Sequence, residues 1–221
     1  MPNITYNDIS NNHEIRTYIQ RGNELLGVLG YTEHSIAHAV KVGEIAANIL
    51  LQLGYSERDA ELARIAGFMH DIGNVVNRVD HAQTGAVLAF NLLTRMGMDA
   101  EEVATIVAAI GNHDEGTGSA VNNVSAALIL ADKTDVRRTR VRNNDFATFD
   151  IHDRVNYAVE KSYTHIIAER NAVLLELAID TKIVSLMDYF EIFLARMLMC
   201  RRAADFLNVN FELVINGTKL L

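Results

Sequence analysis

Cysteine, proline and tryptophan are nearly absent from this chain. Its 221 residues include one cysteine, one proline and no tryptophan. The single cysteine, Cys200, excludes an internal disulfide, and its apolar, helix-like surroundings predict a buried thiol in a reducing compartment. One proline excludes a collagen-like architecture. With 49% hydrophobic and 22% charged residues, the chain is instead expected to fold.

Net positive charge and long apolar runs are also lacking. The formal net charge is −8, whereas binding along nucleic acid without sequence preference needs a cationic surface, so we do not expect it. No stretch reaches the roughly 18 apolar residues of a membrane helix, and no basic-then-apolar leader opens the chain. From these absences we expect neither membrane insertion nor secretion. The predicted location is the cytoplasm.

Apolar residues recur at helical spacing through most of the chain before residue 136. Ser56 followed by Asp59 is typical of a helix start, Asp80 and Asp99 are predicted caps, and Gly73 is a predicted stop. The spacing predicts helices over residues 12–29, 34–53, 56–69, 80–97, 99–112 and 121–136.

The pattern changes after residue 136. An Arg- and Asn-rich stretch, 136–145, is predicted to separate two domains, 1–145 and 146–221. Beyond it the sequence predicts a mixed segment, with a short helix (153–160), a β-hairpin (164–168 and 172–179), a long helix (184–207), a strand (211–215) and a turn at 216–217. The predicted fold class is mainly α, a helical bundle with a small C-terminal α+β appendage.

The strongest local signal is the pair His70-Asp71 at the end of an apolar helix. Alone, such a pair also fits a helix cap or a hydrogen-bonding role. His38, His113 and Asp132, however, lie on the apolar stripes of three other predicted helices and therefore face the core. A buried carboxylate without a partner is strongly disfavoured, and metal coordination satisfies all five groups together.

In this order and spacing, the residues resemble the HD-domain metal-dependent phosphohydrolases. The resemblance covers residues 34–142 and rests on three elements: the isolated His38, the His70-Asp71 pair within 70–73, and the distant Asp132 within 130–133. It implies an HD-type helical bundle in which His70, Asp71 and Asp132 are catalytic.

Two further histidines, His81 and His113, resemble those of the dinuclear members of the family. The resemblance implies one ion held by His38, His70, Asp71 and Asp132, and a second held by Asp71, His81 and His113. Mixed nitrogen and oxygen ligands suit iron, manganese, zinc or magnesium, of which we rank iron and manganese first. Asp114 stands where the cyclic-dinucleotide-cleaving branch has a second histidine, and 116–119 replaces that branch's Gly-Tyr-Pro signature. Cyclic dinucleotides are therefore not expected substrates, although Asp114 offers an oxygen to a second ion.

The implied reaction is attack of metal-activated water on a phosphate ester or anhydride of a small, nucleotide-like molecule. Lys133, Arg137 and Arg138 are the predicted substrate-binding residues, because guanidinium groups match phosphate oxygens. The alternative for this basic cluster is a solvated or oligomer-facing charge run. His34, one turn before His38, either orients the site or serves only in packing.

Two alternative functions stay open from the sequence. A dinucleoside polyphosphate or alarmone hydrolase has the same ligand set. A regulatory module that binds a nucleotide or a metal without turnover is the other alternative, with the appendage as its interaction surface. We also expect the appendage to mediate self-association, as in a dimer, because its hairpin and long helix are strongly apolar.

Overall fold

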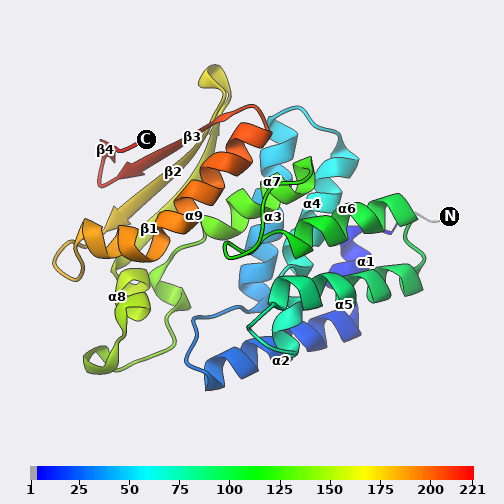
Figure 1. Ribbon diagram of the computed structural model, residues 1–221, viewed down its shortest axis with the longest axis horizontal. Helices are drawn as coiled ribbons and strands as arrows, with labels where there is room; N and C mark the ends of the chain where they lie inside the picture. Colours follow the sequence, from blue (N-terminus) through cyan, green and yellow to red (C-terminus); the bar gives the residue numbers. More distant parts are fainter. Residues whose placement is uncertain (1–3) are drawn as a thin grey trace.

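Helices form most of the molecule, as predicted (Figure 1). The computed structural model describes residues 4–221, so the first three residues of the predicted first domain lie outside the described part. The helices are α1 (Tyr6–Ser10), α2 (His13–Val28), α3 (Ile36–Gln52), α4 (Glu57–Met69), α5 (His81–Met96), α6 (Ala100–Gly111), α7 (Asn123–Lys133), α8 (Ile151–Ala158) and α9 (Leu186–Phe206). A short 3-10 helix, η1 (Ile72–Val75), follows α4.

Side-chain caps fix where several helices begin. Ser56 accepts a hydrogen bond from the backbone of Asp59, and Asp99 accepts one from Glu101, as their sequence pattern predicts. Asp80 is at the predicted N-cap position of α5, but its backbone is left-handed (φ 57°) and its side chain makes no capping hydrogen bond. Asp80 therefore turns the chain into α5 through its backbone rather than through its carboxylate.

The C-terminal part contains a four-stranded sheet of β1 (Val159–Ile167), β2 (Ala172–Ile179), β3 (Asn210–Ile215) and β4 (Thr218–Lys219), in that order. β1 and β2 form the predicted antiparallel hairpin, although β1 begins earlier than expected. β2 and β3 are parallel, and the long helix α9 connects them. Parallel neighbours require such a crossover, because a tight turn can only reverse the chain.

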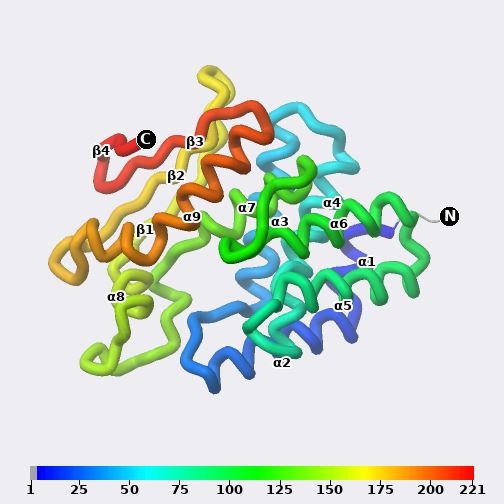
Figure 2. Tube along the Cα trace, in the orientation of Figure 1, coloured from blue at the N-terminus to red at the C-terminus, as the bar shows by residue number. Residues whose placement is uncertain are grey.

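Helix α9 lies between the sheet and the helical body, since it contacts both β3 and α7 (Figure 1). One face of the sheet is buried, with Val173 beside Phe211 and Leu175 beside Leu213. Figure 2 shows the last third of the chain gathered on the side of the molecule away from the N-terminus. Buried residues of both parts nevertheless form one hydrophobic cluster, so the division at residue 145 remains a proposal.

A close helix crossing sets the frame of the site. A Cβ atom at Gly67 of α4 would lie 2.6 Å from the Cα of Gly43 on α3, so only glycine allows the two backbones to approach this closely. The crossing holds His38 of α3 near His70, which caps the C-terminal end of α4. Within residues 4–221, no helix is both long enough and apolar enough to span a membrane.

Candidate metal centre

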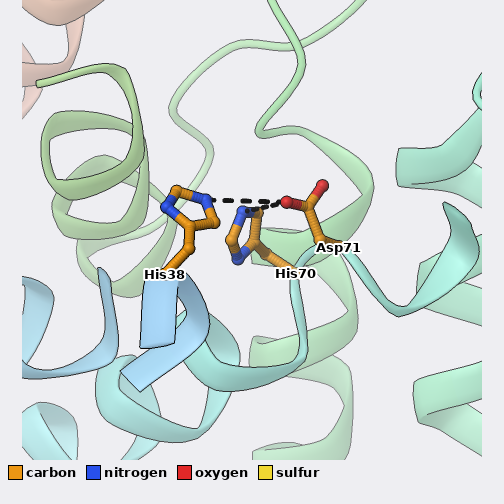
Figure 3. Close-up of side chains that lie close together, drawn as sticks. All are labelled: His38, His70 and Asp71. Atoms are coloured by element: carbon orange, nitrogen blue, oxygen red, sulfur yellow. Dashed lines mark ion pairs between the residues drawn. The ribbon is translucent and has the colours of Figure 1, made fainter. Parts of the chain in front are cut away.

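Four of the predicted ligands meet at one point in the protein interior. The Nε2 atoms of His38 and His70 lie 3.6 and 3.0 Å from Oδ2 of Asp71, and 3.4 and 3.5 Å from Oδ1 of Asp132. Figure 3 shows both imidazole rings directed at the same oxygen of Asp71. Three separate elements, α3, the end of α4 and α7, therefore contribute to a single cluster.

The converging atoms lack partners within the described part of the chain. His38 Nε2, His70 Nε2 and Asp71 Oδ2 are buried, and none makes a hydrogen bond there. Most buried polar atoms in proteins are satisfied, so three orphans at one point indicate a missing binding partner. The three residues meet the spacing of a metal site, with their ligand atoms within 4.8 Å of one another.

A second group shares Asp71 with the first. His81 Nε2 lies 3.6 Å from Oδ1 of Asp71 and 3.2 Å from Nε2 of His113, and these three residues also meet the spacing of a metal site. Gly73 allows the backbone near His81 to approach this closely, because a Cβ at residue 73 would lie 2.0 Å from the carbonyl oxygen of His81. The two oxygens of Asp71 thus face two different groups of ligands, as in a bridging carboxylate.

All four histidines present the same nitrogen to the centre. In each ring Nδ1 faces an oxygen that can only accept, so Nδ1 carries a proton, and Nε2 is the nitrogen that can bind a ligand once it carries no proton of its own. The acceptors are Asp135 for His38 (2.8 Å), Gly67 for His70 (2.8 Å), Arg78 for His81 (3.0 Å) and Ile110 for His113 (2.6 Å).

The spacing fits cations of the size that such ligands bind. Two ligand atoms about 2.1 Å from a shared ion, at roughly 90–110° to each other, lie about 3.0–3.4 Å apart. The Nε2 atoms of His81 and His113, at 3.2 Å, fall in this range. Two lone pairs at that distance repel each other unless a proton or a cation lies between them.

Charge also favours a cation here. Burial opposes protonation of His70, but Asp71 and Asp132 outweigh it and raise the pKa of His70 to about 10. Burial, aided by the charge of His70, lowers the pKa of His113 to about 3, so His113 stays neutral. Although burial also opposes its ionisation, Asp71 is held charged, because His70 keeps the pKa of its carboxyl well below the ordinary value.

Asp135 fixes the orientation of His38 from behind. It is fully buried, and it accepts hydrogen bonds from Nδ1 of His38 (2.8 Å), Nζ of Lys41 (2.6 Å) and Nε of Arg137 (2.9 Å). A carboxylate that holds the far nitrogen of a ligand histidine fixes its tautomer and increases its basicity. Asp135 lies one turn after Asp132 on the same stripe, and that spacing was the signal for it in the sequence.

A cavity of about 440 Å³ opens beside the centre. Asp71, His81, His113 and Asp132 form its floor, and His34 also lines it. Four cationic side chains gather on its wall despite the acidic composition of the chain: Arg78, Lys133, Arg140 and Arg196. Asp150 and Asp153 also line the cavity, so its lining carries both signs of charge, and the four cations are the groups that could pair with an anion next to the proposed metal ligands.

The predicted phosphate-binding cluster divides in the structure. Lys133 lines the cavity, whereas Arg137 and Arg138 do not. Arg137 pairs with Asp135, and Arg138 donates to the carbonyl of Tyr157 and stacks on its ring. Helix α7 ends before Thr134, so helical spacing no longer determines which way the side chains beyond it point.

Asp114 and Glu115 also differ in their placement. Asp114 accepts a hydrogen bond from the backbone of Gly116 and belongs to none of the metal-ligand groups within residues 4–221. Glu115 instead lies 2.7 Å from Lys133, and together with Lys133 it lies beside the floor of the cavity. Reasoning from the sequence left Glu115 and Arg196 without a role, although a lone arginine between the apolar Phe193 and Met197 was a signal.

Comparison with known proteins identifies the family of this chain. Residues 35–192 match the model of the HD domain. The chain belongs to the HD domain family. HD domains bind divalent metals and form a superfamily of metal-dependent hydrolases, and the His-Asp clusters are suited to hold such ions. The match ends within α9, four residues before Arg196.

Several known proteins are similar to part of this chain. An uncharacterized protein of Methanocaldococcus jannaschii is 27% identical over 164 residues, which cover 64% of this chain and 63% of that protein. Ribonuclease Y of Deinococcus radiodurans is 32% identical over 111 residues, 49% of this chain and 18% of the enzyme. A crystal structure of a predicted HD superfamily hydrolase from an uncultured Thermotogales bacterium is 28% identical, covers 56% of this chain and 67% of that one, and has a TM-score of 0.44. The chain thus spans less than two thirds of these two sequence relatives.

Proposed function

We propose that this HD domain hydrolyses a phosphate ester or anhydride of a small, nucleotide-like substrate with the help of one or two divalent cations. One observation carries the proposal: the buried, unpartnered atoms of His38, His70 and Asp71 converge beside a cavity that Asp71 and Asp132 line and to which four cationic side chains contribute. The unpartnered buried atoms support binding of a metal ion. The cationic side chains of the cavity support binding of an anion beside that ion.

The residues have distinct tasks in this proposal. His38, His70, Asp71 and Asp132 hold a first ion, while Asp71, His81 and His113 hold a second, with iron or manganese ranked before zinc or magnesium. A bound ion supplies Lewis acidity, which activates water and stabilises charge on the phosphoryl oxygens. Lys133 orients Asp132, whose Oδ2 lies 2.8 Å from Nζ of Lys133, and contributes positive charge to the cavity.

The test combines metal content with phosphate release. The purified chain, loaded with Mn²⁺ or Fe²⁺ without oxygen, is assayed against nucleoside mono-, di- and triphosphates, a dinucleoside polyphosphate and an alarmone. A short RNA joins the panel because ribonuclease Y is among the similar proteins. We expect turnover of at least one small phosphorylated compound.

Asp71→Asn is the test variant. It keeps the shape of the side chain and removes the negative charge that both ligand groups share. We expect the variant to lose bound metal and turnover together while it stays folded by circular dichroism. Full metal content and normal turnover in Asp71→Asn contradict the assignment. Wild-type protein that binds metal and nucleotide without any turnover supports the regulatory alternative instead.

A further inference from the structure

The long C-terminal helix α9 contributes a cation to the active-site cavity. Arg196 lies in the middle of α9 and lines the cavity together with Phe193, one turn earlier. The guanidinium carbon of Arg196 lies 4.9 Å from the centre of the Phe193 ring. Stacking on an aromatic face and pairing with a carboxylate both hold a guanidinium in one orientation.

Ion pairs connect Arg196 to the proposed metal ligands. Its Nε donates to Oε1 of Glu115 at 2.8 Å, and Oε2 of Glu115 lies 2.7 Å from Nζ of Lys133. Nζ of Lys133 in turn lies 2.8 Å from Oδ2 of Asp132. Arg196 and Lys133 thus share the two oxygens of Glu115, and Lys133 extends the connection to Asp132.

Arg196 differs from the other three cavity cations, because neither of its terminal guanidinium nitrogens has a protein partner within residues 4–221. In Arg78 the terminal Nη1 lies 3.4 Å from Oδ1 of Asn74 and 3.8 Å from Oδ1 of Asp71. Lys133 is held by two carboxylates, and Arg140 donates through two nitrogens to the carbonyls of Glu33 and Asp135. Arg196 uses only Nε, and its two terminal nitrogens have no protein acceptor among the described residues. They form a fixed fork at the cavity wall, the geometry with which arginine binds two oxygens of one phosphate.

We propose that Arg196 binds the phosphate of the substrate through this fork, so that α9 completes the active site. The inference rests on the proposed phosphohydrolase function. It places a substrate-binding residue beyond residues 35–192, the part of the chain that matches the HD domain. It also assigns Glu115 as a positioning residue, which holds Arg196 and Lys133 in their places.

Calorimetry measures binding of inorganic phosphate to the Mn²⁺-loaded protein and to the chelator-treated protein. Steady-state kinetics are measured on the same variants. The variants are Arg196→Gln and Arg196→Lys. Arg201→Gln is the control, since Arg201 is an exposed arginine on the same helix. We expect Arg196→Gln to weaken phosphate binding and to raise KM by about tenfold to a hundredfold, as the loss of a charge-assisted pair implies, with manganese content unchanged. Arg196→Lys should recover part of the loss, and Arg201→Gln should match the wild type.

The outcomes separate this inference from the proposed function. Wild-type phosphate affinity and KM in Arg196→Gln overturn the inference even if the enzyme hydrolyses phosphate esters. Weakened phosphate binding in that variant supports it even if no substrate in the panel is turned over. If Arg196→Gln loses manganese or unfolds, Arg196→Lys decides: full metal content with weaker phosphate binding supports the fork, whereas wild-type phosphate binding rejects it. A wild-type protein that binds no phosphate, with or without Mn²⁺, also rejects it.

Discussion

At the scale of single residues, His70 holds a proton that a metal ion has to displace. Its pKa of about 10 means that the metal-free protein keeps the ring charged at neutral pH, between Asp71 and Asp132. In the metal-free protein this charge stabilises the fold fully below the ordinary pKa of 6.5, and the stabilisation is lost as the pH rises through about 10. A metal ion bound at Nε2 takes over the same electrostatic role.

We therefore predict that binding of the first ion releases about one proton at pH 7.5, and that metal affinity rises about tenfold per pH unit in this range. Calorimetry in two buffers with different ionisation enthalpies measures the number of protons. His113, with a pKa of about 3, is already neutral and should release none. First-ion binding without proton release contradicts the prediction.

Asp135 gives a second prediction at this scale. Asp135→Asn removes the charge that pairs with Lys41 and Arg137 and weakens the hold on His38. We expect metal affinity to fall by about 10–100-fold and the free energy of unfolding to drop by about 3 kcal/mol. Competition with a fluorescent chelator and urea unfolding measure the two effects. Asp205→Asn, at an exposed position on α9, is the control. Wild-type affinity in Asp135→Asn contradicts a positioning role.

His113 separates one ion from two. If both ligand groups are filled, His113→Ala should lower the metal content of the Mn²⁺-loaded protein from about two ions per chain to about one, because His38, His70, Asp71 and Asp132 still form a complete first group. Turnover should fall steeply, since a two-metal reaction needs both ions roughly 3.5–4 Å apart. Elemental analysis measures the content. A wild type that holds one ion, with full activity in His113→Ala, favours the mononuclear site.

The site could be predicted from the sequence where helical periodicity fixes the direction of a side chain. His38 and Asp132 lie on α3 and α7, His113 follows the end of α6 by two residues, and the structure brings all three together with His70-Asp71. Arg137 and Arg138 follow the end of α7, where periodicity no longer applies, and they point away from the cavity. The position of Arg196 among apolar residues marks it as unusual, but that it reaches the cavity depends on the tertiary packing of α9, which no local pattern specifies.

At the scale of elements, predictions succeed where local signals are dense. The long helices have apolar periodicity, caps and terminal glycines, so α2 to α7 occur where the sequence places them, within about three residues at each end. Helix α1 has five residues, too few to show a period, and was not predicted. The pairing of β2 with β3 was also not predicted, because the contact joins strands 30 residues apart.

The crossing of α3 and α4 yields a prediction for these elements. Gly67→Ala places a methyl group 2.6 Å from the backbone of Gly43, which forces apart the helices that hold His38 and His70. We expect a loss of about 3 kcal/mol in the free energy of unfolding, at the upper end for an overpacked core, and weaker metal binding. Urea unfolding and metal titration measure both. Gly111→Ala, whose new Cβ would lie 3.5 Å from Ala86, should change stability by less than about 1 kcal/mol. If the two variants are equally stable, the close approach of α3 and α4 does not require glycine at residue 67.

At the scale of the whole molecule, the described sheet has one protected face and two edge strands, β1 and the two-residue β4. Helix α9 covers the buried face, so the sheet does not need a second chain to cover it. β1, however, is an edge strand within the described sheet, and its Tyr163 side chain is 52% exposed. Edge strands offer unpaired backbone groups to a second copy.

We therefore keep the prediction that the C-terminal part mediates self-association, now through β1. Light scattering on the full chain should give the mass of a dimer, and Tyr163→Lys should shift it to a monomer, because two such edges then bring like charges together. The variant Lys161→Gln, next to it on β1, should leave the dimer intact. A monomeric wild type rejects the prediction.

The parallel pairing of β2 with β3 has a consequence for biosynthesis. The helical body up to α7 leaves the ribosome first, and α9 gains its connection to the sheet when β3, residues 210–215, has emerged to pair with β2. Until then the apolar surface of α7 that α9 covers is open to chaperones and proteases. We expect a chain truncated just before β3 to be degraded faster in cells than the chain of 221 residues, which a pulse-chase experiment measures.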